Sequence, residues 1–304
     1  MLSREEKSNK LQKEMEQEEK KTKRKKRIIK LTIIIFIFLL LISLLYSYMR
    51  FIGTKGLVVR EYKVASSKLP ESFHGFKIVH FSDLHYLSTI NKNDLKNLVT
   101  NINKLKPDIV VFTGDLTDRF IKINSNDLND IIELLNKINV TTGLYAVKGN
   151  HDYDTNNFDS VFSQTDFKIL NNSYDLIYYH GNTPILITGV GSKIKGDMDI
   201  STAYSYNEMD NIFTISLLHE PDYIDDIITT NNVDLALSGH SHNGQVAIPF
   251  IGAIKTVKGG RKYPNRHYKI YDTDLYVSGG LGTSKLKIRF FNRPSINFYR
   301  LVKE

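Results

Sequence analysis

At the centre of this sequence stands the stretch Gly149-Asn150-His151-Asp152. It follows an apolar run at 144–147, which is typical of a buried strand. A strand that ends in glycine and then presents Asn, His and Asp places polar groups at the carboxyl edge of a sheet, where open α/β sheets carry their sites. On its own the stretch also fits an ordinary turn, because Gly, Asn and Asp are common turn residues. Its partners elsewhere in the chain decide between the two interpretations.

The positive charge of this chain is concentrated in its first 30 residues. The 304 residues carry a formal net charge of +8. Residues 1–30 hold 12 Lys/Arg and 6 Asp/Glu, whereas the rest of the chain holds 29 and 27. The main body therefore lacks the basic excess of a nucleic-acid-binding protein. The absence of cysteine excludes disulfides and thiolate metal sites.

The N-terminal region reads as a basic tail followed by an apolar segment. Residues 1–27 are polar, end in a basic cluster at 20–27, and favour a solvated helix or disorder over a coiled coil. Residues 31–49 are 19 consecutive uncharged residues, about the length that crosses a hydrocarbon layer. We therefore expect a transmembrane anchor at 28–49. The alternative is a cleaved signal peptide, which the missing small-x-small cleavage site disfavours.

The charge around this segment predicts its orientation. Because the basic cluster precedes the span, the positive-inside rule places the tail in the cytoplasm and the body outside the cell membrane, with the cluster against anionic lipid headgroups. Residues 50–56 form a linker that reaches at most about 25 Å when fully extended. We therefore expect the body, residues 57–304, to work close to the membrane surface.

The body begins with an alternation of strands and helices. Strands are predicted at 76–81, 108–113 and 143–148, with helices at 93–105 and 127–138. This β-α-β-α-β order predicts a parallel sheet in an α/β domain. A strand-rich second half favours a second, mixed sheet within the same domain. Its predicted strands lie at 185–190, 212–218, 233–237, 245–249, 275–278 and 296–301.

Five polar clusters each follow a predicted strand. A parallel sheet brings the carboxyl ends of adjacent strands together, so the clusters are expected to meet in one crevice. Their His nitrogens and Asp or Asn oxygens suit divalent metals such as Mn, Fe or Zn. A single such His is as often a capping or hydrogen-bonding residue, but five clusters together favour a metal site. They are Asp83-Leu84-His85, Gly114-Asp115-Leu116-Thr117-Asp118, Gly149-Asn150-His151-Asp152, His219 and Gly239-His240-Ser241-His242.

In this order the clusters resemble the complete motif set of the calcineurin-like metallophosphoesterases, over about residues 76–249. Flanking sequence such as Leu218-His219-Glu220-Pro221-Asp222 is similar to the membrane-associated bacterial branch of that family. The resemblance implies a four-layer α/β/β/α sandwich of two mixed sheets with two divalent metal ions. It assigns one metal to Asp83, His85 and His242, and the other to Asn150, His219 and His240, with Asp115 bridging them.

The resemblance also implies the catalytic residues. His151 would be the proton donor or transition-state stabiliser, and Asp152 would orient it. Two divalent cations outweigh the only anionic ligands, Asp83 and Asp115, so the remaining positive charge attracts a phosphate ester and stabilises its transition state. The expected nucleophile is a metal-bridging hydroxide, formed because two metals lower the pKa of a shared water. His151 would then give a proton to the leaving oxygen.

Departures from the family pattern narrow the range of activities that we expect. The protein serine/threonine phosphatases carry Gly-Asn-His-Glu and an Arg-Gly after the second motif, whereas this chain has Asp152 and Arg119-Phe120. A protein phosphatase is therefore disfavoured. The turn Gly279-Gly280-Leu281-Gly282 resembles one of the bacterial branch or is a plain hairpin. Later cations fit a distal anion site or, for most of them, a solvated face: Arg261, Lys262, Lys285, Lys287 and Arg289.

We therefore expect a membrane-anchored phosphoesterase that hydrolyses a phosphodiester or pyrophosphate bond. The branch includes enzymes similar to UDP-2,3-diacylglucosamine pyrophosphatases, but an outward-facing body favours a wall-polymer or phospholipid ester. The alternative is a non-enzymatic metal-binding surface protein. Nucleic-acid binding through residues 20–27 is not expected, because the adjoining span makes lipid headgroups the nearer partner.

Overall fold

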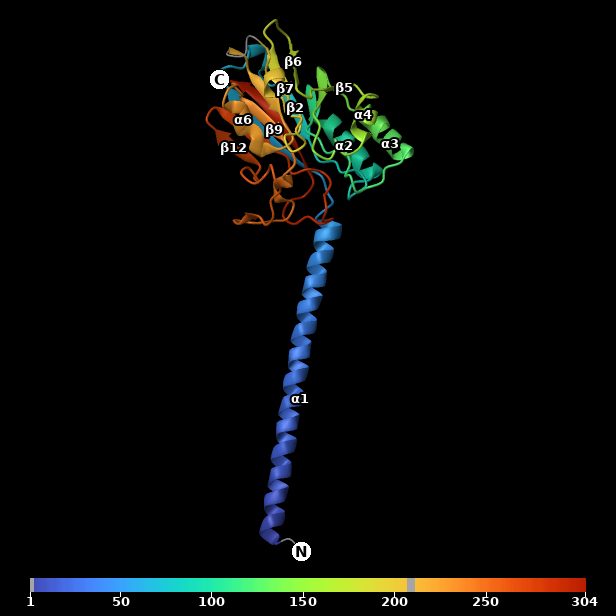
Figure 1. Ribbon diagram of the computed structural model, residues 1–304, viewed down its shortest axis with the longest axis vertical. Helices are drawn as coiled ribbons and strands as arrows, with labels where there is room; N and C mark the ends of the chain where they lie inside the picture. The colour runs from blue at the N-terminus through green and yellow to red at the C-terminus, as the bar shows by residue number, and fades with distance from the viewer. Residues whose placement is uncertain (1–2, 207–210) are drawn as a thin grey trace. The chain divides into compact units, whose positions relative to one another are not determined.

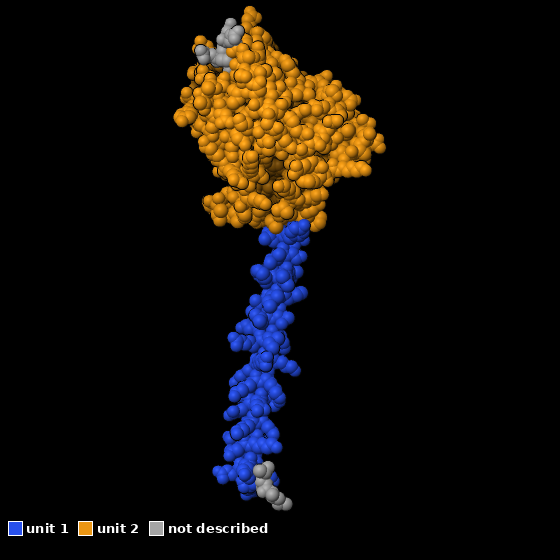
Figure 2. All heavy atoms as spheres, viewed as in Figure 1, with its two compact units in different colours: residues 1–48 blue, residues 49–304 orange. Residues whose placement is uncertain are grey.

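The computed structural model describes residues 3–206 and 211–304 (Figure 1). The chain divides into two units, Met1–Tyr48 and Met49–Glu304 (Figure 2). Met1 and Leu2 of the expected tail lie outside the described residues. Each unit is a separate body with its own internal structure.

The first unit is one long helix, α1, Arg4–Ser47. It begins at Ser3, whose hydroxyl accepts from the amide of Glu6 while the Glu6 carboxylate accepts from the amide of Ser3. This reciprocal capping satisfies two of the free amides of the first turn. The helix includes both the basic tail and the apolar segment, and none of its residues 4–47 is buried. It is long and apolar enough to cross a membrane, a property that anchors and signal sequences share.

The second unit contains two six-stranded mixed sheets within residues 49–206 and 211–304. The first has the order β1-β14-β2-β3-β4-β5, and the second has the order β12-β13-β9-β8-β7-β6. The first sheet consists of β1 Val58–Ser66, β2 Lys77–Phe81, β3 Ile109–Phe112, β4 Gly143–Ala146, β5 Phe167–Ile169 and β14 Ser295–Lys303. The second consists of β6 Ser173–Ile177, β7 Ile185–Gly189, β8 Thr214–Leu217, β9 Leu235–Ser238, β12 His267–Ile270 and β13 Thr273–Val277.

The alternation of side chains along each strand creates the layers. In β3, Ile109 and Val111 face the core between the two sheets, whereas Val110 and Phe112 face the core beneath the helices. The helices α2 Lys92–Leu105, α3 Ser125–Leu135 and α4 Asn157–Phe162 cover that outer face (Figure 1). The helices α5 Ile200–Ala203 and α6 Ile224–Ile228 pack with a third core on the second sheet. The predicted α/β/β/α sandwich is confirmed.

The two six-stranded sheets contain four strands that were not predicted from the sequence, β1, β5, β6 and β12. The longest of them, β1, pairs in parallel with β14 from Val58 to Ser66. Its sequence mixes charged and apolar residues because it is a half-exposed edge strand. The strand predicted at 245–249 is reduced to β10, Ala247–Ile248, which forms a short hairpin with β11, Gly252–Ala253. Pairing ends there because Phe250 adopts a left-handed φ of 68° at the turn.

Candidate dimetal site

Six of the seven expected ligands come together where strands of both sheets end. Asp83 and His85 follow β2, Asp115 follows β3, His219 follows β8, and the His240–His242 turn follows β9. Backbone bonds join the loops, with the amide of Asp83 donating to the carbonyl of Gly114 at 2.8 Å and the amide of His85 to that of Asp115 at 3.1 Å. The ligand atoms form two groups, each within 4.8 Å: Asp83, His85 and His242 in one, and Asp115, His219 and His240 in the other.

The backbone at these ligands is strained. Five of the expected ligands adopt left-handed φ values, which cost a residue other than glycine about 1–2 kcal/mol each. Such conformations persist only where the surrounding structure enforces them, and they cluster at functional sites. The φ values are 52° at Asp83, 39° at His85, 61° at Asp115, 66° at His240 and 49° at His242.

Asp115 lies between the two groups. Its Oδ2 atom is 3.2 Å from Nε2 of His219 in its own group and 3.6 Å from Nε2 of His85 in the other. The Oδ1 atom of Asp83 is 3.1 Å from Nε2 of His242. The position of Asp115 between the two groups is the one that a carboxylate needs in order to bridge two cations.

Two of the histidines have one ring nitrogen fixed by the backbone. Nδ1 of His219 donates to the carbonyl of Thr113 at 2.6 Å, and Nε2 of His240 donates to that of Lys258 at 2.7 Å. Each bond fixes which nitrogen carries the proton in the neutral ring, so the other nitrogen of each ring would offer its lone pair to a bound metal. Metal-ligating histidines are commonly held in this way.

Several buried polar atoms of the site have no hydrogen-bond partner in the part of the chain that the structure describes. Such an atom costs about 1–3 kcal/mol when it stays unsatisfied. A divalent cation would satisfy the nitrogen and oxygen donors, so these residues fit a binuclear centre. The atoms are both ring nitrogens of His85, Nε2 of His219, Nδ1 of His242, Nδ1 of His151 and Oδ1 of Asn150.

Burial sets the protonation of these groups. It lowers the pKa of His85 to about 4 and that of His240 to about 4, so both rings are neutral and ready to bind metal near neutral pH. The pKa of Asp115 lies below its usual value, because the neighbouring His219 outweighs the effect of burial. Burial and the nearby Asp115 raise the pKa of Asp152 to about 7.

Asp152 bonds to the backbone of two site loops. Its carboxylate accepts from three backbone amides, those of Asp115 at 2.8 Å, Leu116 at 2.9 Å and Gly149 at 2.8 Å. Asp152 therefore links the loop at 115–116 to its own loop at 149–152. The carboxylate beside the ring of His151 belongs to Asp118, whose Oδ1 lies 4.0 Å from Nδ1 of that ring. The backbone amide of His151 donates to Asp115 at 2.8 Å.

Arg289 supports the site through the glycine turn at 279–282. It was expected on a distal anion site or a solvated face, but it is fully buried. Its guanidinium donates to the carbonyls of Gly279 at 2.8 Å and Gly282 at 2.6 Å. A Cβ at Gly280 would lie 3.0 Å from that of Asp83, and one at Gly282 would collide with the carbonyl of Leu84. The glycine turn is therefore a close packing surface for the first ligand loop rather than a plain hairpin.

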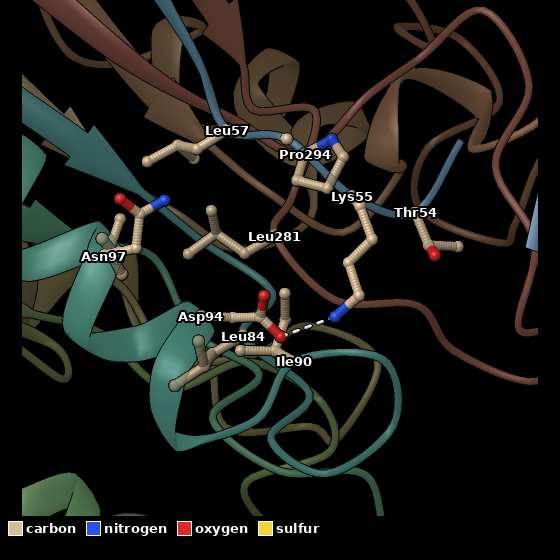
Figure 3. Close-up of a pocket in the computed structure, with 11 residues that line it drawn as sticks. Thr54, Lys55, Leu57, Leu84, Ile90, Asp94, Asn97, Leu281 and Pro294 are labelled. Carbon is tan, nitrogen blue, oxygen red and sulfur yellow. Dashed lines mark hydrogen bonds and ion pairs between the residues drawn. The ribbon is translucent and has the colours of Figure 1, made fainter. Parts of the chain in front are cut away.

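A small pocket lies behind that ligand loop (Figure 3). Apolar side chains such as Leu57, Leu84 and Leu281 line it, and Nζ of Lys55 lies 2.7 Å from Oδ2 of Asp94 at its edge. None of the expected metal ligands is among its lining residues in the described part of the chain. The pocket therefore belongs to the packing of residues 54–57 and not to the metal centre.

Comparison with known proteins identifies the family. Residues 76–244 match the calcineurin-like phosphoesterases. The chain belongs to this family. The calcineurin-like phosphoesterases are metal-dependent, and the two buried His/Asp groups agree with that chemistry. The resemblance in the motifs is confirmed.

The curated relatives of this calcineurin-like phosphoesterase include three that bear on its function and location. An uncharacterized metallophosphoesterase of Bacillus subtilis, YkuE, is 35% identical, with 84% of this chain and 89% of that protein covered. The UDP-2,3-diacylglucosamine pyrophosphatase LpxG of Chlamydia muridarum is 28% identical, with 78% and 88% covered. A transmembrane protein with a metallophosphoesterase domain of Danio rerio is 28% identical, with 78% and 56% covered.

Proposed function

We propose that this chain is a membrane-anchored hydrolase that cleaves a phosphodiester or pyrophosphate bond with two divalent metal ions. The observation that carries the proposal is the pair of buried His/Asp groups, joined at Asp115. The family supplies the reaction class, a phosphoesterase. The buried groups supply the ligands that such a reaction requires.

The proposed ligand sets follow the geometry of the loops. Asp83, His85 and His242 would hold one ion, and His219 and His240 would hold the other with the unpartnered Oδ1 of Asn150. Asp115 is shared. When bound, the ions supply positive charge to the phosphate and activate a water as nucleophile. The protein contributes only two carboxylates to them, so the site stays positive toward an anionic substrate.

His151 is the proposed proton donor to the leaving oxygen. Its backbone is fixed by the bond from its amide to Asp115 at 2.8 Å, and its ring lies beside Asp118 at 4.0 Å. Because His151 belongs to neither ligand group, its ring is free to transfer a proton. Asp152 acts indirectly, by holding the backbone of the loops before and after it.

The proposed location is the cell membrane, with the N-terminus in the cytoplasm and the catalytic domain outside. The helix α1 is long and apolar enough to span a bilayer, and its basic half precedes the apolar half. Relatives include a protein described as transmembrane and one described as a UDP-2,3-diacylglucosamine pyrophosphatase. We therefore propose a lipid-linked or cell-envelope phosphate ester as substrate.

The test uses the full chain in detergent micelles, stripped of metal and then supplied with Mn²⁺, Fe²⁺ or Zn²⁺ in turn. Hydrolysis of bis(p-nitrophenyl) phosphate is measured first, followed by a panel of phospholipids and nucleotide-sugar lipids. Turnover that requires both the metal and Asp115 supports the proposal. Stoichiometric metal binding without turnover of any substrate would instead indicate a non-enzymatic metal-binding surface protein.

A further inference from the structure

Three segments of the second unit expose large apolar side chains. The tip of the β10–β11 hairpin carries Phe250, which is fully exposed, and Ile251, which is 75% exposed. Soluble surfaces rarely gather such residues without a partner. The other exposed apolar side chains lie in the segments 49–53 and 285–291 or at the end of the hairpin. They are Phe51, Ile52, Ile254, Leu286 and Phe291, each at least half exposed.

Backbone bonds join the three segments into one surface, which we call the apolar rim. The amide of Ala247 in the hairpin donates to the carbonyl of Phe290 at 3.0 Å, and the amide of Phe290 donates to that of Gln245 at 3.2 Å. The amide of Arg289 donates to the carbonyl of Met49 at 3.0 Å. The exposed side chains therefore belong to one connected region rather than to isolated loops.

The charged residues of the hairpin and of the segment 284–293 are of one sign. The segments 245–258 and 284–293 contain no Asp or Glu. They carry exposed cations on both sides of the apolar side chains. These cations are Lys255, Lys258, Lys285, Lys287 and Arg293. Apolar residues bordered by Lys and Arg match the interface of an anionic bilayer. There, apolar side chains enter the acyl boundary, and Lys and Arg contact the anionic headgroups.

We propose that the apolar rim rests in the headgroup region of an anionic bilayer. Met49 is the first residue of its unit and the last residue of the expected anchor, 28–49, so the chain enters this unit at one of the three segments of the rim. A covalent connection to a membrane anchor favours lipid over a second protein as the occupant. This inference goes beyond the proposed hydrolysis and rests only on the proposed anchor.

The apolar rim is built on the same loop as a metal ligand. Gln245 follows His242 by three residues, and the side chain of Asn292 donates to the carbonyl of His242. Gly244 packs directly on Ala253 of the hairpin. A rim seated in the headgroup layer would therefore hold the metal centre beside that layer. Taken with the proposed function, on which this last step rests, the position favours as substrate an ester whose phosphate lies at headgroup depth.

The absence of tryptophan from the sequence makes a direct test available. The variants Phe250→Trp and, as matched control, Tyr271→Trp each place a single fluorophore at an exposed aromatic position; Tyr271 is 89% exposed and lies between β12 and β13. The full-length variants are reconstituted into vesicles of phosphatidylcholine and phosphatidylglycerol that contain bromine-labelled acyl chains. Each sample is also assayed with bis(p-nitrophenyl) phosphate.

The proposal predicts a blue-shifted emission for Phe250→Trp and quenching roughly twofold stronger than for Tyr271→Trp, because the rim reaches the acyl boundary. The difference should shrink in vesicles without the anionic lipid. Equal quenching of the two variants would overturn the proposal, as would a Phe250→Trp blue shift that depends on protein concentration rather than lipid, since a second copy would then cover the rim. Hydrolysis in the same samples reports separately on the proposed function.

Discussion

The Nε2 atom of His219 lies 3.2 Å from the Oδ2 atom of Asp115, and this contact joins the edges of the two sheets. Asp115 follows β3 of the first sheet, and His219 follows β8 of the second. The candidate site is therefore complete only when the two sheets pack on each other. Its residues are far apart in sequence, but the sandwich brings them together.

Replacement of Asp115 by Asn should abolish most of the activity. Asn keeps the shape of the side chain but removes the charge that both groups of ligands share, so the metal-dependent rate should fall by about 100-fold or more. The measurement is turnover of bis(p-nitrophenyl) phosphate under saturating metal. Asp272→Asn, an exposed carboxylate outside the site, is the matched control and should retain activity. Activity of Asp115→Asn close to wild type would contradict the proposed bridging role.

Replacement of His151 by Ala should slow the reaction without releasing metal. General-acid catalysis contributes about 100- to 10,000-fold, and the loss should be larger for alkyl phosphodiesters than for p-nitrophenyl esters, whose leaving group departs without a proton. The measurement compares turnover of the two ester types at equal metal content. An equal loss for both would argue against proton donation by His151.

Asp118→Asn should produce a smaller form of the same defect. Its carboxylate lies 4.0 Å from the ring of His151 and 3.9 Å from that of His85, and Ser284 donates to it at 3.1 Å. Replacement of a residue that acts through another group in this way lowers activity by about 10- to 100-fold. The pH profile of turnover should shift in Asp118→Asn, whereas a purely structural role would lower the rate equally at every pH.

Arg289→Met should destabilise the fold more than an equivalent change on the surface. The guanidinium is fully buried, and its removal leaves the carbonyls of Gly279 and Gly282 without their donor. Each buried group left unsatisfied costs about 1–3 kcal/mol, so the free energy of unfolding should fall by roughly 2–6 kcal/mol. Urea denaturation measures it, with exposed Lys287→Met as control. Equal stability of both variants would show that Arg289 does not hold the glycine turn.

His80 should make the metal-free protein sensitive to acid. Burial lowers the pKa of His80 to about 3, whereas an unfolded chain protonates histidine near its usual value of 6.5. As the pH falls below 6.5, His80 binds a proton in the unfolded state but not in the folded state. The free energy of unfolding therefore decreases by up to about 1.4 kcal/mol per pH unit until the pKa of the folded state is reached. The variant His80→Gln should show a shallower decrease between pH 6.5 and 4 in urea denaturation. Identical slopes would contradict this assignment.

Local sequence pattern predicted a parallel sheet, a second mixed sheet and the meeting of polar clusters at the strand ends, whereas the four-layer sandwich was implied by the resemblance to the family. Strands such as β3 are short, apolar and flanked by polar clusters, so both their existence and the side on which their polar residues lie can be read from local pattern. The edge strand β1 was missed because its side chains alternate between charged and apolar residues, and its pairing with β14 joins the two ends of the body. Pairing over such a distance has no local signal.

The supporting residues of the site could not be predicted in the same way. Arg289 has the sequence context of a surface cation, and only the fold shows that the glycine turn surrounds it. The contacts of Asp152 and Asp118 depend on the path of the backbone through left-handed conformations at Asp83 and Asp115. Motif spacing identifies which residues meet, but it does not determine which carboxylate lies beside which ring.

The metal content of the purified full-length chain tests the central claim most directly. After removal of metal and reloading with Mn²⁺, plasma mass spectrometry of the desalted protein should find two ions per chain, with both lost on chelation. One ion per chain, or none under conditions that preserve the fold, would contradict a binuclear centre held by Asp83, Asp115 and their histidine partners.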